Sequence, residues 1–385
     1  MNTTASQRRP WWSGPCLVIL CLLPSSGAYE TGNSFASPTS SFRQAEAGYS
    51  YIFPRDHGAH EEYQTEWWYY TGHLSTAAGR QFGYQLTFFR RALASEAART
   101  NPSRWAIRQL YLAHFALSDL DRARFRFAEK ISRAGIGKAG ADAGRLRVWI
   151  DRWSAEALTG THEPHHLEAS TTEFSIDLVV NPEKPPIVHG RRGISRKGDA
   201  PGQASHYYSL TRLGTTGTVT IGDQPLAVRG TSWMDHEFSS SDLGEDLTGW
   251  DWFSIQLDNQ MELMLYQLRR EDGGFAPASS GTMVYPDGDT RHLSASDFAV
   301  DVLDRWTSQT SGARYPSRWR VTVFPEELTL ELVPRLAEQE LMTERSTRVT
   351  YWEGAVGVAG TQQGASIEGQ GYVELTGYAQ PLKQR

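Results

Sequence analysis

From Tyr49 onward, short runs of apolar and aromatic residues alternate with clusters rich in glycine, proline, asparagine and serine. The runs have the length of strands and are rich in β-branched or aromatic residues, whereas helical periodicity is weak. They are Thr65–Leu74, Gln81–Arg91, Leu110–Leu117, Leu146–Trp153, Phe174–Val180, Tyr207–Leu213, Gly249–Leu257, Met261–Arg269, Trp319–Phe324 and Gly371–Tyr378. This pattern predicts an all-β protein, built as a sandwich or a barrel.

The first 28 residues have the pattern of a secretory signal peptide. Arg8 and Arg9 precede an apolar run, Cys16–Leu23, which is too short to span a bilayer, and small residues follow it. We predict cleavage after Ala28, secretion into the periplasm, and a flexible tail over 29–48. The alternative is that the segment is retained as an anchor. No later apolar run approaches membrane length, so we expect no transmembrane segment after cleavage.

Composition narrows the classes of function. Both cysteines, Cys16 and Cys21, lie in the leader, so the mature chain has no disulfide and no thiol nucleophile. Without the leader, 36 basic and 44 acidic residues give a net charge of −8, which argues against nucleic acid as a partner. The segment 162–166 matches the spelling of a zinc-protease motif, but that motif needs a helix and Pro164 argues against one. We predict neither a metal nor a cofactor.

A stretch rich in proline and glycine, 181–205, interrupts the strand pattern. We predict that it connects two domains, 49–204 and 205–385; alternatively, it is one long surface loop within a domain. A faint internal repeat favours two similar units. Trp67 precedes Tyr84-Gln85-Leu86 at nearly the same spacing at which Trp250 precedes Tyr266-Gln267-Leu268.

The second copy of this repeat predicts a β-hairpin that carries a candidate proton-donating carboxyl group. If Asp258-Asn259 forms a two-residue turn, Asp251 lies directly opposite Tyr266, and both share a face with Met264. A carboxyl group on such an apolar, aromatic face loses water, so its pKa should rise and it could donate a proton near neutral pH. The alternative is that Asp251 only fixes the hairpin through a hydrogen bond.

Asp235-His236-Glu237 forms a second group of ionisable residues. In an extended segment Asp235 and Glu237 share one face and His236 lies on the other. Histidine carries protons near neutrality, although His236 could equally serve only as a structural cap. Glu66 and Glu353 are further acids among aromatic residues, and we interpret both as barrel-rim residues.

Seven segments together resemble the AttH-like family, which is related to hydroxyneurosporene synthase, the carotenoid 1,2-hydratase. They are 66–74 (EWWYYTGHL), 82–90 (FGYQLTFFR), 184–190 (KPPIVHG), 232–238 (SWMDHEF), 249–253 (GWDWF), 351–356 (YWEGAV) and 371–378 (GYVELTGY). The resemblance implies two lipocalin-like antiparallel β-barrels in tandem with a ligand cavity. For the hydratase branch it implies cofactor-free addition of water to a terminal isoprenoid double bond. The hydratases have a His-x-Trp segment where this chain has His236-Glu237-Phe238, so the indole N–H donor is absent here.

The sequence thus predicts a secreted protein that takes an apolar, isoprenoid- or polyene-like molecule into an aromatic cavity and acts as a hydro-lyase or isomerase. Asp251 would protonate the double bond, Tyr266 would orient that acid, and His236 with its neighbours Asp235 and Glu237 would handle the proton of water. The predicted ligand-binding residues are Trp67, Tyr69, Trp233, Phe238, Trp250, Trp252 and Met264. The alternatives are a non-catalytic carrier and a secreted hydrolase built on residues 235–237. The sequence specifies neither the ligand nor the oligomeric state.

Overall fold

The predicted strands form two antiparallel β-sheets in the computed structural model of the chain. The structure describes residues 42–93, 103, 106–159, 163–200, 202–241, 244 and 246–382, so the predicted signal peptide lies outside the described residues. The helical turns of this part are Arg55–His57 (η1), Leu120–Arg122 (η3) and Phe324–Glu326 (η4). No helix in the described ranges is long and apolar enough to cross a membrane.

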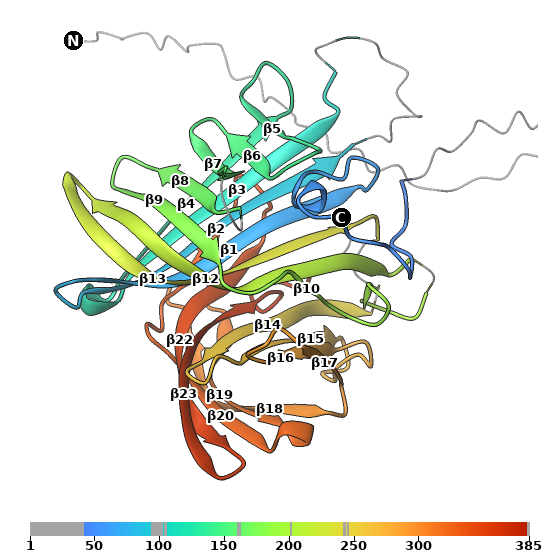
Figure 1. Ribbon diagram of the computed structural model, residues 1–385, viewed down its shortest axis with the longest axis vertical. Helices are drawn as coiled ribbons and strands as arrows, with labels where there is room; N and C mark the ends of the chain where they lie inside the picture. Colours follow the sequence, from blue (N-terminus) through green and yellow to red (C-terminus); the bar gives the residue numbers. More distant parts are fainter. Residues whose placement is uncertain are drawn as a thin grey trace, which may run out of the picture. The chain divides into compact units, whose positions relative to one another are not determined.

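The first sheet contains the strands drawn from blue to yellow in Figure 1, in the order β4-β3-β2-β1-β13-β12-β9-β8-β7-β6-β5, with β10 and β11 paired to β12. Its strands are β1 (Thr65–Thr76), β2 (Gln81–Ala92), β3 (Gln109–Asp119), β4 (Arg124–Arg133), β5 (Ala139–Ala141), β6 (Arg147–Ile150), β7 (Trp153–Ala157), β8 (His165–Ser170), β9 (Phe174–Pro182), β10 (Ile187–Val188), β11 (Ser195–Arg196), β12 (Ala204–Ile221) and β13 (Gln224–Ser239).

The second sheet has the order β17-β16-β15-β14-β23-β22-β20-β19-β18, with β21 paired to β22. Its strands are β14 (Leu247–Leu257), β15 (Glu262–Arg270), β16 (Ser280–Val284), β17 (Thr290–Ser294), β18 (Phe298–Thr307), β19 (Arg314–Val323), β20 (Leu328–Pro334), β21 (Glu340–Met342), β22 (Thr350–Gln362) and β23 (Ala365–Leu375). Each sheet curls around its own apolar core. The prediction of an all-β protein with two barrel-like units in tandem is therefore confirmed.

The sheets divide the chain at a different place from the predicted domain boundary at 204/205. β12 and β13 extend the first sheet to Ser239, and the second sheet begins with β14 at Leu247. The segment 183–203 connects β9 to β12 within the first sheet, as in the alternative of a long loop. Residues 42–48, assigned to the flexible tail, are anchored, because Ala45 packs with Ile194 and Ala204.

A third apolar layer lies between the two sheets, and the period of two along each strand explains it. On β1, Trp68 and Tyr70 point into the core of the first barrel, while Tyr69 joins the layer between the sheets. On β14, Phe253 points into the second core, while Trp252 joins the middle layer. These strands are buried on both faces, which is why both faces of their sequences are apolar.

Buried ion pairs and a glycine hold the sheets close together. Arg212 of β12 bonds Glu262 of β15 through its Nε at 2.5 Å, and Lys184 Nζ reaches the same carboxylate at 2.8 Å. Gly83 lies where a Cβ atom would be 2.5 Å from the Tyr372 hydroxyl of β23, so only glycine allows this approach. The middle layer is therefore a fixed interface on which a site can be built.

Candidate functional site

A cavity of about 360 Å³ lies in the middle layer, lined by side chains of both sheets. The first sheet contributes residues of β1, β2, β3, β12 and β13, and the second contributes residues of β14, β15, β22 and β23. Aromatic rings form much of the wall; Tyr69 and Trp252, for example, meet edge to face with their ring centres 5.2 Å apart. Concave, mostly apolar sites with a few polar groups are typical of small-molecule binding.

Four carboxyl groups point into this aromatic cavity, and the strand registers explain why they meet. On the first sheet, Asp235 of β13 is paired with Tyr69, and Glu237 with Trp67. On the second sheet, Glu374 of β23 is paired with both Trp252 of β14 and Glu353 of β22. The four carboxyl groups are those of Asp235, Glu237, Glu353 and Glu374. Such a concentration of acids in an apolar site is a mark of function, because it is costly to bury.

Asp235 is held by three hydrogen-bond donors. It accepts hydrogen bonds from the Tyr207 hydroxyl at 2.7 Å, from Trp233 Nε1 at 2.6 Å, and from the Ser209 hydroxyl. Burial raises the pKa of Asp235 to about 7, although these donors oppose the shift. Asp235 can therefore gain or lose a proton near neutral pH, as a general base must.

His189 extends this network behind the cavity wall. Its Nε2 lies 2.6 Å from the Ser209 hydroxyl and its Nδ1 lies 2.8 Å from the Thr282 hydroxyl of the second sheet. Burial lowers the pKa of His189 to about 3, so the ring is neutral. Since Ser209 donates its proton to Asp235, Nε2–H must donate to Ser209, and Nδ1 accepts from Thr282. His189 thereby fixes the hydroxyl that serves Asp235.

Glu353 has the opposite environment from Asp235. Both of its carboxyl oxygens are buried without a well-formed hydrogen bond among the described residues, and so is the hydroxyl of Tyr69. Tyr69 is a donor near this carboxyl group, and its weak hydrogen bond opposes the rise in the pKa of Glu353. Burial, together with the nearby Glu374, raises the pKa of Glu353 well above its ordinary value. Burial also raises the pKa of Glu374 to about 8. At neutral pH the side chains of Glu353 and Glu374 are therefore neutral carboxylic acids that can donate a proton.

A cation marks one end of the cavity. Lys197 Nζ lies 3.1 Å from Glu237 Oε1 and 4.4 Å from the centre of the Tyr266 ring. Burial opposes the charge of Lys197, but the attraction of Glu237 outweighs it and raises the lysine pKa. This end is therefore an ion pair, unlike the neutral acids near Tyr69.

Most of the site residues predicted from the sequence reach this cavity. Its lining includes Asp235, Glu237, Tyr266, Trp67, Tyr69, Trp250 and Trp252. Trp233 and Met264 belong to the same apolar layer, where Trp233 supports Asp235. The tertiary structure thus brings together residues that lie up to 199 positions apart, from Trp67 to Tyr266.

Asp251 does not lie on this cavity, and the predicted hairpin register is wrong by one residue. The turn contains three residues, 258–260, with Gln260 at φ +66°, so Trp252 is paired with Tyr266 and Asp251 with Gln267. Asp251 therefore points to the other face of β14 from Tyr266. There it binds Arg269 Nε at 2.8 Å and accepts a hydrogen bond from the Tyr378 hydroxyl at 3.0 Å. The proposed role of Asp251 as proton donor loses its geometric basis.

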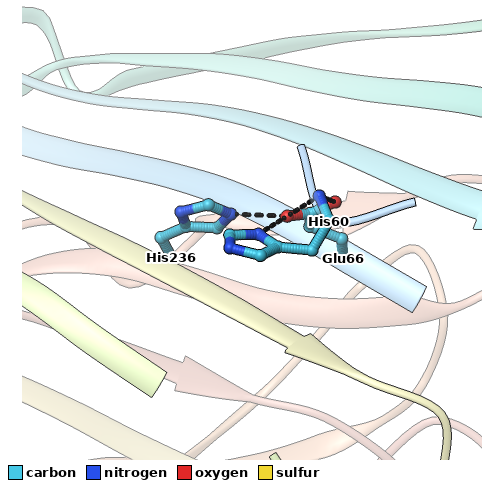
Figure 2. A group of neighbouring side chains, drawn as sticks. All are labelled: His60, Glu66 and His236. Atoms are coloured by element: carbon cyan, nitrogen blue, oxygen red, sulfur yellow. Dashed lines mark hydrogen bonds and ion pairs between the residues drawn. The ribbon is translucent and has the colours of Figure 1, made fainter. Parts of the chain in front are cut away.

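His236 and Phe238 also point away from the cavity, as the predicted alternation along 235–237 requires. Phe238 stacks on His60 with ring centres 3.6 Å apart. His236 Nε2 lies 2.9 Å from Glu66 Oε1 inside the first barrel, and the His60 ring approaches the same oxygen at 2.8 Å (Figure 2). His236 is therefore separated from Asp235 and Glu237 by its own strand.

The group His60, Glu66 and His236 has donor atoms within 4.8 Å of one another, as a metal site would. These atoms, however, already bond one another, and the Glu66 carboxylate also binds Arg90 Nε at 2.9 Å. Burial opposes the charge of His60, but its bonds to Asp56 and Glu66 raise its pKa to about 9. The geometry fits a buried ion cluster, in which the positive charge is supplied by Arg90 and His60. That the chain holds no metal stays a prediction.

Sequence reasoning missed several residues of the cavity wall. The sequence pattern predicts Glu353 as a rim residue and gives no reason to expect Glu374, Gln85, Lys197 or Tyr207 in the wall. The available signal was an acid alternating with an aromatic residue on a strand, as in Tyr351 and Glu353. That signal shows that the acid and the ring share a face of the strand, but it does not show which face of the strand lines a cavity.

The acids of the cavity make stability depend on pH. Glu374 keeps its proton up to pH about 8 in the folded chain, whereas an unfolded chain loses it near its ordinary value of 4.5. The free energy of unfolding should therefore fall as pH rises between these values, and Glu374→Gln should remove on the order of 5 kcal/mol of that fall. Urea unfolding at several pH values measures this. The exposed Glu368→Gln on the same strand is the control, and an equal slope in both variants would contradict the assignment.

Comparisons with known proteins agree on one fold. The sequence profile described as AttH-like matches residues 44–378. The crystal structure of a putative AttH from Nitrosomonas europaea is 34% identical, with a TM-score of 0.77, covering 86% of this chain and 98% of that chain. Kievitone hydratase from Nectria haematococca shares the fold, with 13% identity and a TM-score of 0.66, covering 89% of this chain and 97% of that chain.

A curated fungal relative gives a weaker match. The dehydratase asqC of Emericella nidulans is 20% identical over 250 residues, which span 63% of this chain. The match covers 66% of that dehydratase, just under two thirds of its length. The relatives of this chain thus include proteins named for hydration and dehydration.

Proposed function

Because this chain belongs to the AttH-like family, and because its cavity holds buried carboxylic acids among aromatic rings, we propose that it protonates a carbon–carbon double bond of a small molecule. Addition of water would complete a hydration, and loss of a neighbouring proton would complete an isomerisation. The bound part of the molecule is an isoprenoid- or polyene-like chain. The hydratase and dehydratase names among the relatives support this class of reaction.

The observation that carries the proposal is the buried carboxyl group of Glu353, whose oxygens have no well-formed hydrogen bond among the described residues. A neutral carboxylic acid in an apolar wall can transfer its proton to one alkene carbon and leave a cation on the other. The rings of Trp67, Tyr69 and Trp252 line the same cavity, and their faces stabilise a developing positive charge. A hydrogen-bonded carboxyl group, such as that of Asp251, is less suited to give up its proton to carbon.

Asp235 supplies the complementary base. When water adds to the cation, a new carbon–oxygen bond forms and the oxygen must lose one proton. Asp235 can accept that proton because its pKa is near 7 and because its three donors stabilise the carboxylate. Return of the proton to Glu353 restores both groups, so the net reaction is addition of one water molecule. Two carboxyl groups in contrasting environments are the usual arrangement for paired acid and base catalysis.

The two rival hypotheses fare differently. A hydrolase built on residues 235–237 requires His236 beside the two acids, but His236 bonds Glu66 on the opposite side of β13. A carrier without chemistry needs the cavity alone, and it is the second candidate. The poorly hydrogen-bonded carboxyl group of Glu353 favours the enzyme, because a carrier gains nothing from a buried acid of this kind.

The proposal includes export of the protein as well as binding of an unsaturated molecule, and one purification tests both. We expect the protein recovered from the periplasm of its own source to begin at Tyr29, as intact mass spectrometry would show. Native mass spectrometry of that sample should reveal a bound molecule, which is then extracted. Incubating the extract with the protein in ¹⁸O-labelled water should yield a product that carries one heavy oxygen.

Two results would argue against this function. A bound molecule without any double bond would leave Glu353 nothing to protonate. A molecule that binds tightly but gains no oxygen and shows no shifted double bond would favour the carrier.

A further inference from the structure

A second cavity, of about 430 Å³, lies farther along the layer between the sheets and shares no lining residue with the aromatic cavity. On β1, Trp67 and Tyr69 line the aromatic cavity, whereas His73 and Ser75 line the second one. These four residues alternate along one strand, so their side chains lie on the same face. The two cavities therefore follow one another along a single face of the first sheet.

Two arginines from different sheets line this second cavity. Arg229 lies on β13 of the first sheet, and Arg335 directly follows β20 of the second. Both side chains are exposed, and neither guanidinium group has a hydrogen-bond or ion-pair partner among the described residues. In the part of the chain that the structure describes, no residue lining this cavity is an aspartate or a glutamate. The wall therefore carries positive charge that no acid of the wall balances.

His73 lies close to both arginines. In the pairing of β1 with β13, Arg229 is displaced by two residues from the partner of His73, so the two are diagonal neighbours on one face. Burial lowers the pKa of His73 to about 4, and the charge of Arg335, approaching from the other sheet, adds to this shift. The ring is therefore neutral, and its Nε2–H donates to the Gly371 carbonyl at 2.8 Å. The positive charge of the cavity comes from the arginines, not from His73.

Gln370 and Thr231 add a neutral hydrogen-bond donor to the same wall. Gln370 Nε2 donates to the Thr231 hydroxyl at 2.6 Å, which joins β23 to β13. In this orientation the Thr231 hydroxyl proton has no acceptor among the described residues. If the amide is turned over, Thr231 donates to the amide oxygen and the amide nitrogen keeps its protons instead. In either orientation one donor remains for a ligand that offers acceptors.

We propose that this second cavity binds the phosphate group of a small molecule. A phosphate monoester carries nearly two negative charges at neutral pH and presents three acceptor oxygens. These match the two guanidinium groups and the neutral donor, and arginine is well suited to phosphate because its N–H donors bind in pairs. The cavity leaves room for a small organic group beside the phosphate. This binding does not depend on the reaction proposed for the aromatic cavity, because the two cavities share no lining residue.

Calorimetric titrations with glycerol 3-phosphate and with glycerol, at constant ionic strength, measure this binding. The wild type should bind glycerol 3-phosphate but not glycerol, which differs only in lacking the phosphate. Arg229→Gln and Arg335→Gln should each weaken binding on the order of tenfold, because each removes charged donors to the phosphate. Arg314→Gln is the control, since Arg314 is exposed and lies outside the cavity lining. Near-ultraviolet circular dichroism confirms that the variants fold.

Two results would overturn the assignment outright. One is failure of the wild type to bind glycerol 3-phosphate, and the other is binding that Arg229→Gln and Arg335→Gln both leave unchanged. Tighter binding of malonate than of glycerol 3-phosphate would also overturn it, by assigning the cavity to a carboxylate ligand. Glu353→Gln should leave the affinity for glycerol 3-phosphate unchanged, so a phosphate site can be established even if the aromatic cavity shows no turnover.

Discussion

Glu353→Gln is expected to abolish turnover while the ligand still binds. The amide keeps the size and polarity of the side chain but has no acidic proton to transfer to carbon. Loss of a general acid typically costs 10²- to 10⁴-fold in rate, so kcat should fall by about that factor. The affinity for the ligand should change by no more than about threefold, because the cavity wall keeps its shape. Incorporation of labelled oxygen measures the first quantity, and tryptophan quenching measures the second.

Two further variants make this result specific. Glu368→Gln removes an exposed acid on the adjacent strand β23 and should leave turnover unchanged. Asp251→Asn tests the assignment that the sequence favoured. Since Asp251 binds Arg269 and Tyr378 behind β14, its loss should lower stability and leave turnover of the folded fraction largely intact. The opposite pattern, with Asp251→Asn inactive and Glu353→Gln active, would return the role of acid to Asp251.

Glu66→Ala is expected to cause the largest loss of stability, on the order of 3–5 kcal/mol in the free energy of unfolding. Glu66 is fully buried, and its carboxylate accepts bonds from Arg90 Nε, His236 Nε2 and the His60 backbone N–H at 2.9–3.0 Å. Without it, the fully buried Arg90 guanidinium loses its carboxylate partner. The positive charge of His60 is destabilised at the same time, so its raised pKa should fall.

Denaturant unfolding of the wild type and the variant measures this effect. Glu173→Ala provides the comparison, because Glu173 is exposed and lies 3.8 Å from Arg126. Removing such a surface pair should cost no more than about 1 kcal/mol. A loss in Glu66→Ala as small as in Glu173→Ala would mean that the cluster is not a major source of stability. Tighter binding of a divalent metal by the wild type than by Glu66→Ala would instead reassign the cluster as a metal site.

The candidate site could be predicted in part because strand alternation is a local property. The sequence placed Asp235 and Glu237 on one face and His236 on the other, and the structure has this arrangement. Each side chain on an extended strand points opposite to its neighbour, whatever the strand packs against. The same rule correctly grouped Trp250 with Trp252, and both line the cavity.

The register of β14 against β15 could not be predicted from the sequence, because it depends on one residue in the turn that connects the two strands. The sequence Asp258-Asn259 is compatible with a two-residue turn, but the chain includes Gln260 in the left-handed region and makes a three-residue turn. One added residue moves every cross-strand pair and places Asp251 and Tyr266 on opposite faces. The energy that decides this comes from the packing of β15, which places Leu263 and Leu265 in the second core and Met264 and Tyr266 in the middle layer, and that packing is not local.

The sequence by itself determined the all-β class and the face that each strand residue shares with its neighbours, because these follow from short-range alternation. The two barrel-like units were indicated by the faint internal repeat and by the resemblance to a family. Only the tertiary structure decided which faces enclose the cavity. β12 and β13 pair into the first sheet, and packing of the two sheets brings Glu353 and Glu374 opposite Asp235. The free energy of that packing comes from contacts between residues far apart in the chain, so no local pattern records it. The resulting burial, rather than the residue type, turns an ordinary glutamate into a neutral acid.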